Sequence, residues 1–304
     1  MCGIVGYIGS KQAAPFLLDG MSKLEYRGYD SAGIAVLEKG QVRVEKCVGR
    51  LDALRQKLEG NMPESVIGIG HTRWATHGRP SDRNSHPHTD SSGKFVVVHN
   101  GIIENYLALK EELIAKGVEF SSDTDTEVVA HLMADLFDGD MESTVKKVLK
   151  VIKGSYSLVF MCEAEQDKII CTKKDNPLVI GLGEGENFIA SDIPAIINHT
   201  RRTFIMSDGE IATVTKDGVW VQDIEGTPIN KKVFEVNWNA GAAEKGGFEH
   251  FMLKEIYEQP KAMRDTMTGR VNAEEKTITF PELNWTSEEL QGINKIFIVA
   301  CGTA

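Results

Sequence analysis

The sequence lacks any apolar run long enough to span a bilayer, which takes about 20 residues. Its N-terminus also lacks the basic, apolar and small-residue order of a secretory signal peptide. Positive charge is not in excess, because the formal net charge is −10 at pH 7, whereas nucleic-acid phosphates are bound by clustered Lys and Arg. We therefore expect a cytoplasmic protein with no membrane partner and no nucleic-acid partner.

Paired cysteines are missing as well. None of the five cysteines forms a CxxC motif, which argues against a zinc ribbon and against a thioredoxin-like site. An odd number of cysteines fits reduced thiols. Cys47, Cys162 and Cys171 stand in apolar, strand-like settings, which predict core positions.

Metal and cofactor motifs are not found in the sequence either. His86 and His88 stand near His71 and His77, but neither an HExxH motif nor a cluster of carboxylates accompanies them, so a metal site is disfavoured. The glycines of residues 181–185 have the wrong spacing for a nucleotide loop and precede a strand, which predicts a hairpin. We expect no metal and no cofactor.

What is present is an ordinary globular composition with 41% hydrophobic and 26% charged residues. The 304 residues suggest about two domains, at roughly 150 residues each. Apolar periodicity predicts helices at 15–24, 51–58, 105–115 and from a cap at 123–126 through 136. It predicts strands at 4–8, 34–37, 42–48, 66–70, 95–99, 157–162, 168–172, 178–181, 187–190, 203–206, 210–215 and 219–222.

Composition changes near Gly226, and this predicts a first domain over residues 1–225. Residues 226–292 are assigned to a linker with a helical segment at 251–267, interrupted at Pro260. Residues 293–304 begin with an apolar run, Lys295–Ala300, that predicts a buried strand leading into Cys301-Gly302-Thr303.

Cys2 directly follows the initiator methionine. Once Met1 is removed, Cys2 carries a thiol and a free α-amine on one Cα atom, which pairs a nucleophile with a base. The alternative is a small, buried and inert thiol near the terminus.

Three further polar segments follow predicted strands or precede a predicted helix, and such ends gather at one rim of a sheet. There Asn100 and Gly101 offer N–H donors for an oxyanion, Arg73 offers a clamp for a carboxylate, and Asp125 offers a partner for an ammonium. The alternatives are a plain Asn-Gly turn, a surface ion pair for Arg73 and a helix cap for Asp125.

Several further motifs stand along the chain. They are Met-Cys-Gly-Ile-Val-Gly at the start, the stretches 26–33, 71–78, 86–88, 99–105, 124–127, 181–192 and 254–260, and the terminal Cys-Gly-Thr. Taken together, these motifs resemble class II glutamine amidotransferases. The resemblance covers essentially the whole chain. It implies an α+β fold, a four-layer αββα sandwich of the N-terminal-nucleophile hydrolase type, followed by a linker and the first strand of a truncated α/β sugar-isomerase domain.

The resemblance also implies roles for single residues. Cys2 is the nucleophile, with Asn100 and Gly101 as the oxyanion hole. L-Glutamine is bound by Arg73, Thr76, His77 and Asp125, with Arg73 on the carboxylate and Asp125 on the α-amine. Trp74 gates an ammonia channel. Arg27, Gly28 and His86 lie near the nucleophile.

Within the family, the chain is most similar to members in which a sugar-isomerase region follows. The resemblance implies that fructose 6-phosphate is a second substrate only of the full-length protein, which is expected to be a homodimer. The chain ends at Ala304, where such members have Ser after Cys-Gly-Thr, so no sugar-phosphate residue is assigned. Two alternatives remain open: another class II amidotransferase, such as a phosphoribosyl or asparagine-forming enzyme, and a non-catalytic glutamine-binding module.

Overall fold

The computed structural model describes residues 2–237, 248, 250–268, 270–272, 277–279 and 285–297. The chain divides into two compact units, Met1–Glu244 and Lys245–Ala304, which are described one at a time.

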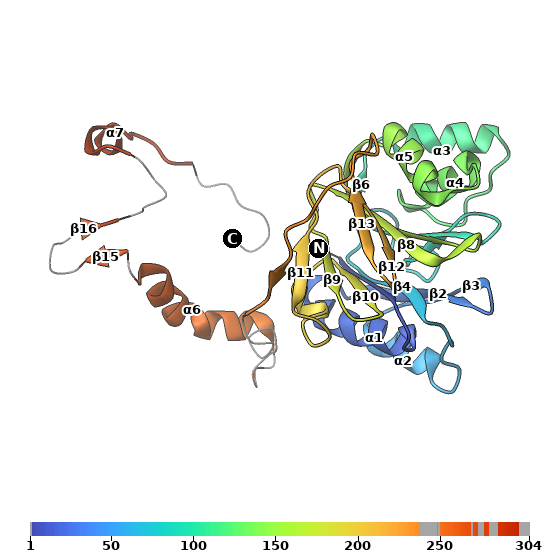
Figure 1. The fold of residues 1–304 in the computed structure, drawn as a ribbon, viewed down its shortest axis with the longest axis horizontal. Coiled ribbons are helices and arrows are strands. Elements are labelled where there is room, and N and C mark those ends of the chain that lie inside the picture. Colours follow the sequence, from blue (N-terminus) through green and yellow to red (C-terminus); the bar gives the residue numbers. More distant parts are fainter. Residues whose placement is uncertain are drawn as a thin grey trace. The chain divides into compact units, whose positions relative to one another are not determined.

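The first unit contains an antiparallel sheet of eight strands (Figure 1). Its strands, in spatial order, are β14 (Phe234–Glu235), β11 (Arg202–Ile205), β9 (Val179–Leu182), β10 (Asn187–Ala190), β1 (Gly3–Ile8), β4 (Ile67–Arg73), β2 (Ser31–Glu38) and β3 (Gln41–Val48). The central strand β1 pairs with β10 on one side and with β4 on the other.

A second antiparallel sheet has six strands. In spatial order they are β13 (Val219–Gln222), β12 (Ile211–Thr215), β8 (Glu165–Lys174), β7 (Gly154–Cys162), β6 (Phe95–Ile103) and β5 (His88–Thr89). The long pair β6 and β7 runs in continuous register from Phe95 opposite Cys162 to Ile103 opposite Gly154.

Helices cover the outer face of each sheet. One outer layer, at the top in Figure 1, contains α3 (Tyr106–Ala115), α4 (Glu127–Leu136) and α5 (Met141–Val151). The other contains α1 (Ala13–Leu24) and α2 (Leu51–Leu58), with the short 3-10 helices η1 (Glu25–Arg27) and η2 (Ile193–Ala195) beside α1. The order of layers is therefore helix, sheet, sheet, helix.

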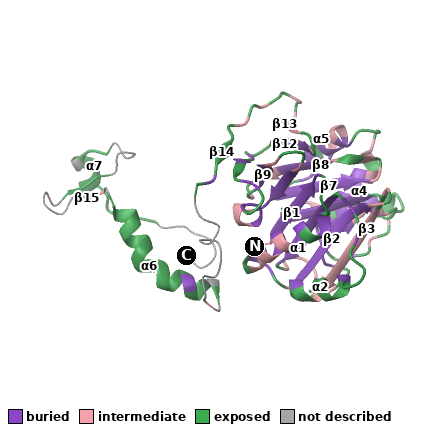
Figure 2. Ribbon diagram, turned by 60° about the horizontal axis from the view of Figure 1, so that its bottom comes forward, coloured by how far each residue is buried: buried purple, intermediate pink, exposed green. Residues whose placement is uncertain are grey.

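Side chains along each strand point alternately to its two faces, so one strand contributes to two separate hydrophobic cores. On β1, Val5 and Tyr7 pack towards α1, while Ile4 and Ile8 belong to the core between the two sheets. β6 supplies the same inner core with Val96 and Val98. Because β1 has both faces covered, all six of its residues are buried, and Figure 2 shows most strands of both sheets in purple.

The predicted strands from Ser157 to Gln222 and the hairpin at 181–185 are confirmed, the latter as the turn between β9 and β10. Two features of the first unit differ from the sequence interpretation. The sequence interpretation missed α5, and it ended a strand at His99, whereas β6 continues through Asn100 and Gly101 to Ile103. The continuation is stabilised because both residues pair with β7, opposite Ser157 and Tyr156.

The second unit contains α6 (Phe251–Met267), the strand pair β15 (Val271–Asn272) and β16 (Thr277–Ile278), and α7 (Ser287–Gln291). The expected interruption at Pro260 is wrong, because α6 runs through this residue. The predicted strand Lys295–Ala300 is not seen in its described part, since 295–297 form no strand and Ile296 and Phe297 are exposed. Residues 298–304, including Cys301-Gly302-Thr303, lie outside the described residues.

The boundary of the first unit differs from the one that composition suggested at residue 225. β14 pairs with β11 in the eight-stranded sheet, and Val236 is buried.

Among the residues that the structure describes, no helix is both long and apolar enough to cross a membrane.

Candidate active site

A cavity of about 270 Å³ opens at the end of the two sheets where β1 begins and β4 ends. Ligand pockets are typically about 300 Å³ or larger, so this cavity suits a small molecule. The residues that line it are Cys2, Arg27, Arg73, Trp74, Thr76, His77, His86, His99, Asn100, Gly101, Ile102, Thr124, Asp125, Thr126, Ser155 and Asn176. The structure thus brings together every predicted site residue except Gly28.

The thiol of Cys2 lies against the backbone of the loop that follows β4. The Trp74 N–H donates to Cys2 Sγ at 3.1 Å, and the thiol reaches the Trp74 carbonyl at 3.5 Å. Burial raises the pKa of Cys2, while the Trp74 N–H and the Arg73 guanidinium oppose this effect. A neutral thiol at rest needs a base before it can attack a carbonyl.

The plain-turn alternative for Asn100 and Gly101 is wrong, since both belong to β6. The Asn100 side chain donates from Nδ2 to the Cys2 carbonyl oxygen at 3.1 Å. Gly101 has a φ of +126°, and a Cβ atom there would lie 2.0 Å from the Ser155 carbonyl oxygen. Only glycine fits this position, because a side chain would meet both an unfavourable backbone conformation and the β7 backbone.

Arg73, the last residue of β4, is 3% exposed, which excludes a surface ion pair. Its Nη2 donates to the carbonyl oxygens of His77 and Gly78. Its Nη1 is buried and has no hydrogen-bond partner among the described residues. Burial lowers the pKa of Arg73, and Asp30, Cys2 and Asp125 oppose this shift. The guanidinium therefore keeps donor capacity for an anionic ligand.

Asp125 is not the helix cap that the sequence allowed. The N-cap of α4 is Thr126, which makes no side-chain capping bond and instead contacts His99 Nδ1 at 2.9 Å through Oγ1. Asp125 Oδ2 accepts the N–H of Ile103 at 2.8 Å, and Oδ1 lies 3.7 Å from His77 Nδ1. This leaves a buried carboxylate with spare acceptor capacity at the cavity.

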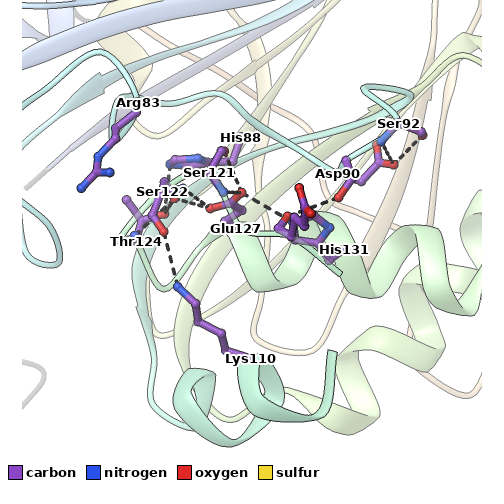
Figure 3. A network of polar contacts seen from close by, with 12 residues as sticks. Arg83, His88, Asp90, Ser92, Lys110, Ser121, Ser122, Thr124, Glu127 and His131 are labelled. Carbon is purple, nitrogen blue, oxygen red and sulfur yellow. Dashed lines mark hydrogen bonds and ion pairs between the residues drawn. The ribbon is translucent and has the colours of Figure 1, made fainter. Parts of the chain in front are cut away.

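A polar network holds the segment that carries Asp125 (Figure 3). The Glu127 carboxylate accepts hydrogen bonds from the N–H and hydroxyl groups of Ser121 and Ser122, at 2.5–2.8 Å. Ser122 Oγ contacts Thr124 Oγ1 at 3.0 Å, and Thr124 in turn contacts His88 Nε2 at 3.1 Å. The backbone on the N-terminal side of Asp125 is therefore tied to the first residue of α4.

The remaining predicted residues form the rim and wall. Trp74 is 49% exposed and packs edge-on against Tyr29. Arg27 is buried and pairs with Asp192 at 3.0 Å. A Cβ atom on Gly28 would lie 2.9 Å from the Trp74 nitrogen, so Gly28 permits close approach of the loop that contacts Cys2.

Thr76 is exposed, and its hydroxyl lies 3.4 Å from His77 Nδ1. His77 also packs edge-on against Tyr106, at 5.3 Å between ring centroids. These two residues and Asp125 thus form one side of the cavity.

Four buried histidines gather at the cavity: His86 and His99 line it, and His71 and His88 stand behind them. Burial lowers the pKa of each of them. The rings of His71 and His86 are stacked, with centroids 4.1 Å apart. Among the described residues, no group of three or more His, Cys, Asp or Glu side chains is arranged to hold a metal ion.

The sequence interpretation gave no role in the site to His71, His99, Ser155 or Asn176, and it assigned Thr126 only to a helix cap. No sequence motif indicated Ser155, which lies in β7, or Asn176, which lies in the loop after β8. His71 and His99 stand in the motifs at 71–78 and 99–105, but nothing local indicated which groups they would contact across the two sheets.

The cavity thus joins a thiol, an amide donor, a guanidinium and a carboxylate. A guanidinium and a carboxylate together suit the two charges of a free amino acid. A thiol beside an N–H donor suits attack on a carbonyl.

Comparison with known proteins finds similar sequences and similar structures. A glutamine amidotransferase domain model matches residues 71–198. Two glutamine–fructose-6-phosphate aminotransferases (isomerizing), from Caldanaerobacter subterraneus subsp. tengcongensis and Clostridium tetani, are 56% and 54% identical over 304 residues. Each similarity covers 100% of this chain and 50% of the relative. The chain therefore spans about half the length of these curated relatives.

Solved structures with the same fold include glutamine phosphoribosylpyrophosphate amidotransferase from B. subtilis. It is 27% identical, with a TM-score of 0.64, over 73% of this chain and 49% of the other. A glutamine aminotransferase class-II domain protein from Silicibacter pomeroyi is 14% identical, with a TM-score of 0.51, over 73% of this chain and 99% of the other, and shows the fold alone.

Proposed function

Since this chain carries a glutamine amidotransferase domain of class II, we propose that it hydrolyses L-glutamine to glutamate and ammonia through a thioester on Cys2. The observation that carries the proposal is the meeting of Cys2, the Asn100 amide, Arg73 and Asp125 around one cavity. Removal of Met1 is part of the mechanism, because it leaves the α-amine of Cys2 free to act as the base.

Catalysis begins when the Cys2 α-amine accepts the thiol proton. The thiolate attacks the side-chain amide carbon of glutamine, and the oxyanion is stabilised by Asn100 Nδ2 and the Gly101 N–H. The tetrahedral intermediate then expels ammonia, which takes the proton from the α-amine. Water, activated by the same amine, hydrolyses the thioester and releases glutamate.

Substrate is held by its two charged groups. Arg73 binds the α-carboxylate of glutamine, and this role is supported by its unpartnered Nη1. Asp125 binds the α-ammonium, with Thr76 and His77 beside it. Trp74 gates the exit of ammonia at the rim, while Arg27, Gly28 and His86 support the nucleophile and its loop.

We assign the fold to the N-terminal-nucleophile type of αββα sandwich. The order of the four layers and the likeness to glutamine phosphoribosylpyrophosphate amidotransferase support this assignment. Four free thiols among the described residues are in keeping with a cytoplasmic location.

The amination of fructose 6-phosphate to glucosamine 6-phosphate belongs to the longer relatives. We propose it, with a homodimeric state, for a protein that carries the rest of such a relative. Sequence identities of 54–56% to these aminotransferases favour this assignment over the phosphoribosyl enzyme, to which the identity is 27%.

Glutamate release by purified chain tests the glutaminase. Cys2→Ala should abolish turnover while glutamine still binds, and Cys47→Ala, at another partly exposed free thiol, is the matched control and should retain it. A glutamine-like electrophile should label Cys2 alone, and intact mass should show that labelled protein lacks Met1. Turnover by Cys2→Ala would place the nucleophile elsewhere. Glutamine binding by unmodified chain without any turnover would favour the non-catalytic module.

The second substrate is tested with the same chain of 304 residues. Incubation with glutamine and fructose 6-phosphate should yield glutamate and ammonia without glucosamine 6-phosphate. Formation of the amino sugar would show that a sugar site lies within these residues.

A further inference from the structure

His71 bridges the two sheets behind the nucleophile. It lies on β4, where its backbone pairs with Ile4 on one side and Gly33 on the other. Its Nε2 atom reaches β6 in the second sheet, at 2.9 Å from the His99 carbonyl oxygen and 3.0 Å from Asn100 Oδ1. The ring is fully buried and takes no part in the steps described above.

The contacts of His71 determine which of its nitrogens carries the proton. A backbone carbonyl oxygen only accepts hydrogen bonds, so Nε2 must be the N–H donor. Nδ1 is then the unprotonated nitrogen, and it has no hydrogen-bond partner among the residues that the structure describes. Burial lowers the pKa of His71 to about 3, which keeps the ring neutral near pH 7.

A fixed donor at Nε2 also determines how the Asn100 amide is turned. The oxygen and nitrogen of an amide have nearly the same shape, and only hydrogen bonds distinguish the two orientations. With the His71 N–H facing Asn100, the amide must present its oxygen to His71. Its NH₂ group then points the other way, where it donates to the Cys2 carbonyl oxygen at 3.1 Å.

We propose that His71 is a positioning residue that holds the Asn100 amide with its NH₂ group directed at the oxyanion. The proposal rests on the glutaminase function proposed above. In a reversed amide, the oxygen would face the oxyanion and repel it, so the rate of thioester formation depends on this orientation.

A purely structural role is the competing explanation, because His71 also stacks on His86. Two substitutions separate the roles. His71→Phe keeps an aromatic ring in the stack but has no donor, whereas His71→Gln can donate to both oxygens. We expect kcat to fall about tenfold in His71→Phe, the factor that corresponds to one lost hydrogen bond, with KM within about threefold. His71→Gln should restore kcat to within about threefold of the unmodified chain.

A double-mutant cycle provides the decisive test. Asn100→Ala alone should lower kcat by roughly 10²–10³. In that background there is no amide left to orient, so adding His71→Phe should change kcat by less than about twofold. A further tenfold loss in the double variant would overturn the proposal, as would a His71→Phe variant with unchanged kcat.

If His71→Phe does not fold, His71→Gln alone decides between the positioning role and a purely structural role. A folded His71→Gln protein with kcat about tenfold below that of the unmodified chain would overturn the proposal, and near-full activity would support it. The proposed function fails separately, since it requires glutamate release by the unmodified chain. Release by that chain together with independent effects of His71 and Asn100 would refute the positioning role alone.

Discussion

Mild acid should destabilise this protein through the buried histidines at the cavity. Burial lowers the pKa of His71 to about 3 and holds those of His86 and His88 well below their ordinary value. In the unfolded chain each ring titrates near ~6.5. Because the folded-state pKa is lowered, the stabilisation is fully present above pH ~6.5 and is lost as the pH falls towards the folded-state values.

The size of the effect follows from proton linkage. Between pH 7 and pH 5.5, an unfolded histidine goes from about one quarter to about nine tenths protonated while the folded one stays neutral, which costs about 1.3 kcal/mol. Three such residues give about 4 kcal/mol, and His99, whose pKa is lowered in the same direction, adds to this loss. A typical domain has only about 5–15 kcal/mol of unfolding free energy.

Urea titrations at pH 7.0 and 5.5 measure this loss, because carboxylates titrate mainly below that range. His88→Gln should reduce the difference between the two pH values by about 1.3 kcal/mol. His199→Gln, at an exposed histidine, is the matched control and should leave the difference unchanged within about 0.5 kcal/mol. A difference below about 1 kcal/mol in the unmodified chain would mean that the histidines accept protons in the folded state.

Two further predictions concern the substrate-binding segment. Asp125→Asn should raise the KM for glutamine steeply, because the substrate ammonium would lose its buried partner. The loss of binding free energy should be roughly 2–5 kcal/mol. Steady-state glutaminase kinetics measure this, and an unchanged KM would exclude contact between Asp125 and the ammonium. Glu127→Gln should lower the free energy of unfolding by about 3 kcal/mol, because the new NH₂ group would face the N–H and hydroxyl donors of Ser121 or Ser122. Urea denaturation measures this effect, with exposed Glu111→Gln as the control, and equal stability of both variants would show that the network contributes little.

Much of the candidate site was predictable because its residues stand in short motifs at strand ends. Cys2 and Arg73 lie at or beside strand termini, which gather at one rim, and Asn100 lies near the end of β6. The position of Asp125 at the cavity was predicted too, but the segment around it was assigned to a helix cap. The sequence left two uses open for Asp125, an ammonium partner and a helix cap, and the structure excludes the cap.

One missed part of the site depended on a contact between distant segments. Thr126 precedes an apolar-periodic run and is typical of an N-cap, but its hydroxyl contacts His99, which is distant in sequence.

The helix α5, which the sequence interpretation also missed, did have a local signal. Met141, Val145, Val148 and Leu149 have helical spacing, and Asp140 caps the helix by accepting the Ser143 N–H at 2.7 Å.

The inner faces of the strands explain why the cavity lies where it does. Side chains two residues apart point to the same face of a strand. On β4, Ile67 and Ile69 belong to the core between the sheets, so the next positions on that face are His71 and Arg73.

The strands β6 and β1 show the same change in polarity. On β6 the inner face continues from Val96 and Val98 to Asn100, and on β1 it continues from Ile8 and Ile4 back to Cys2. All three faces change from apolar to polar at one end of the sandwich. An apolar residue in place of His71 would extend the core by one layer, but it would leave Asn100 Oδ1 without its donor. The period of two along these strands therefore places Cys2, His71, Arg73 and Asn100 on inner strand faces at the same end of the sandwich.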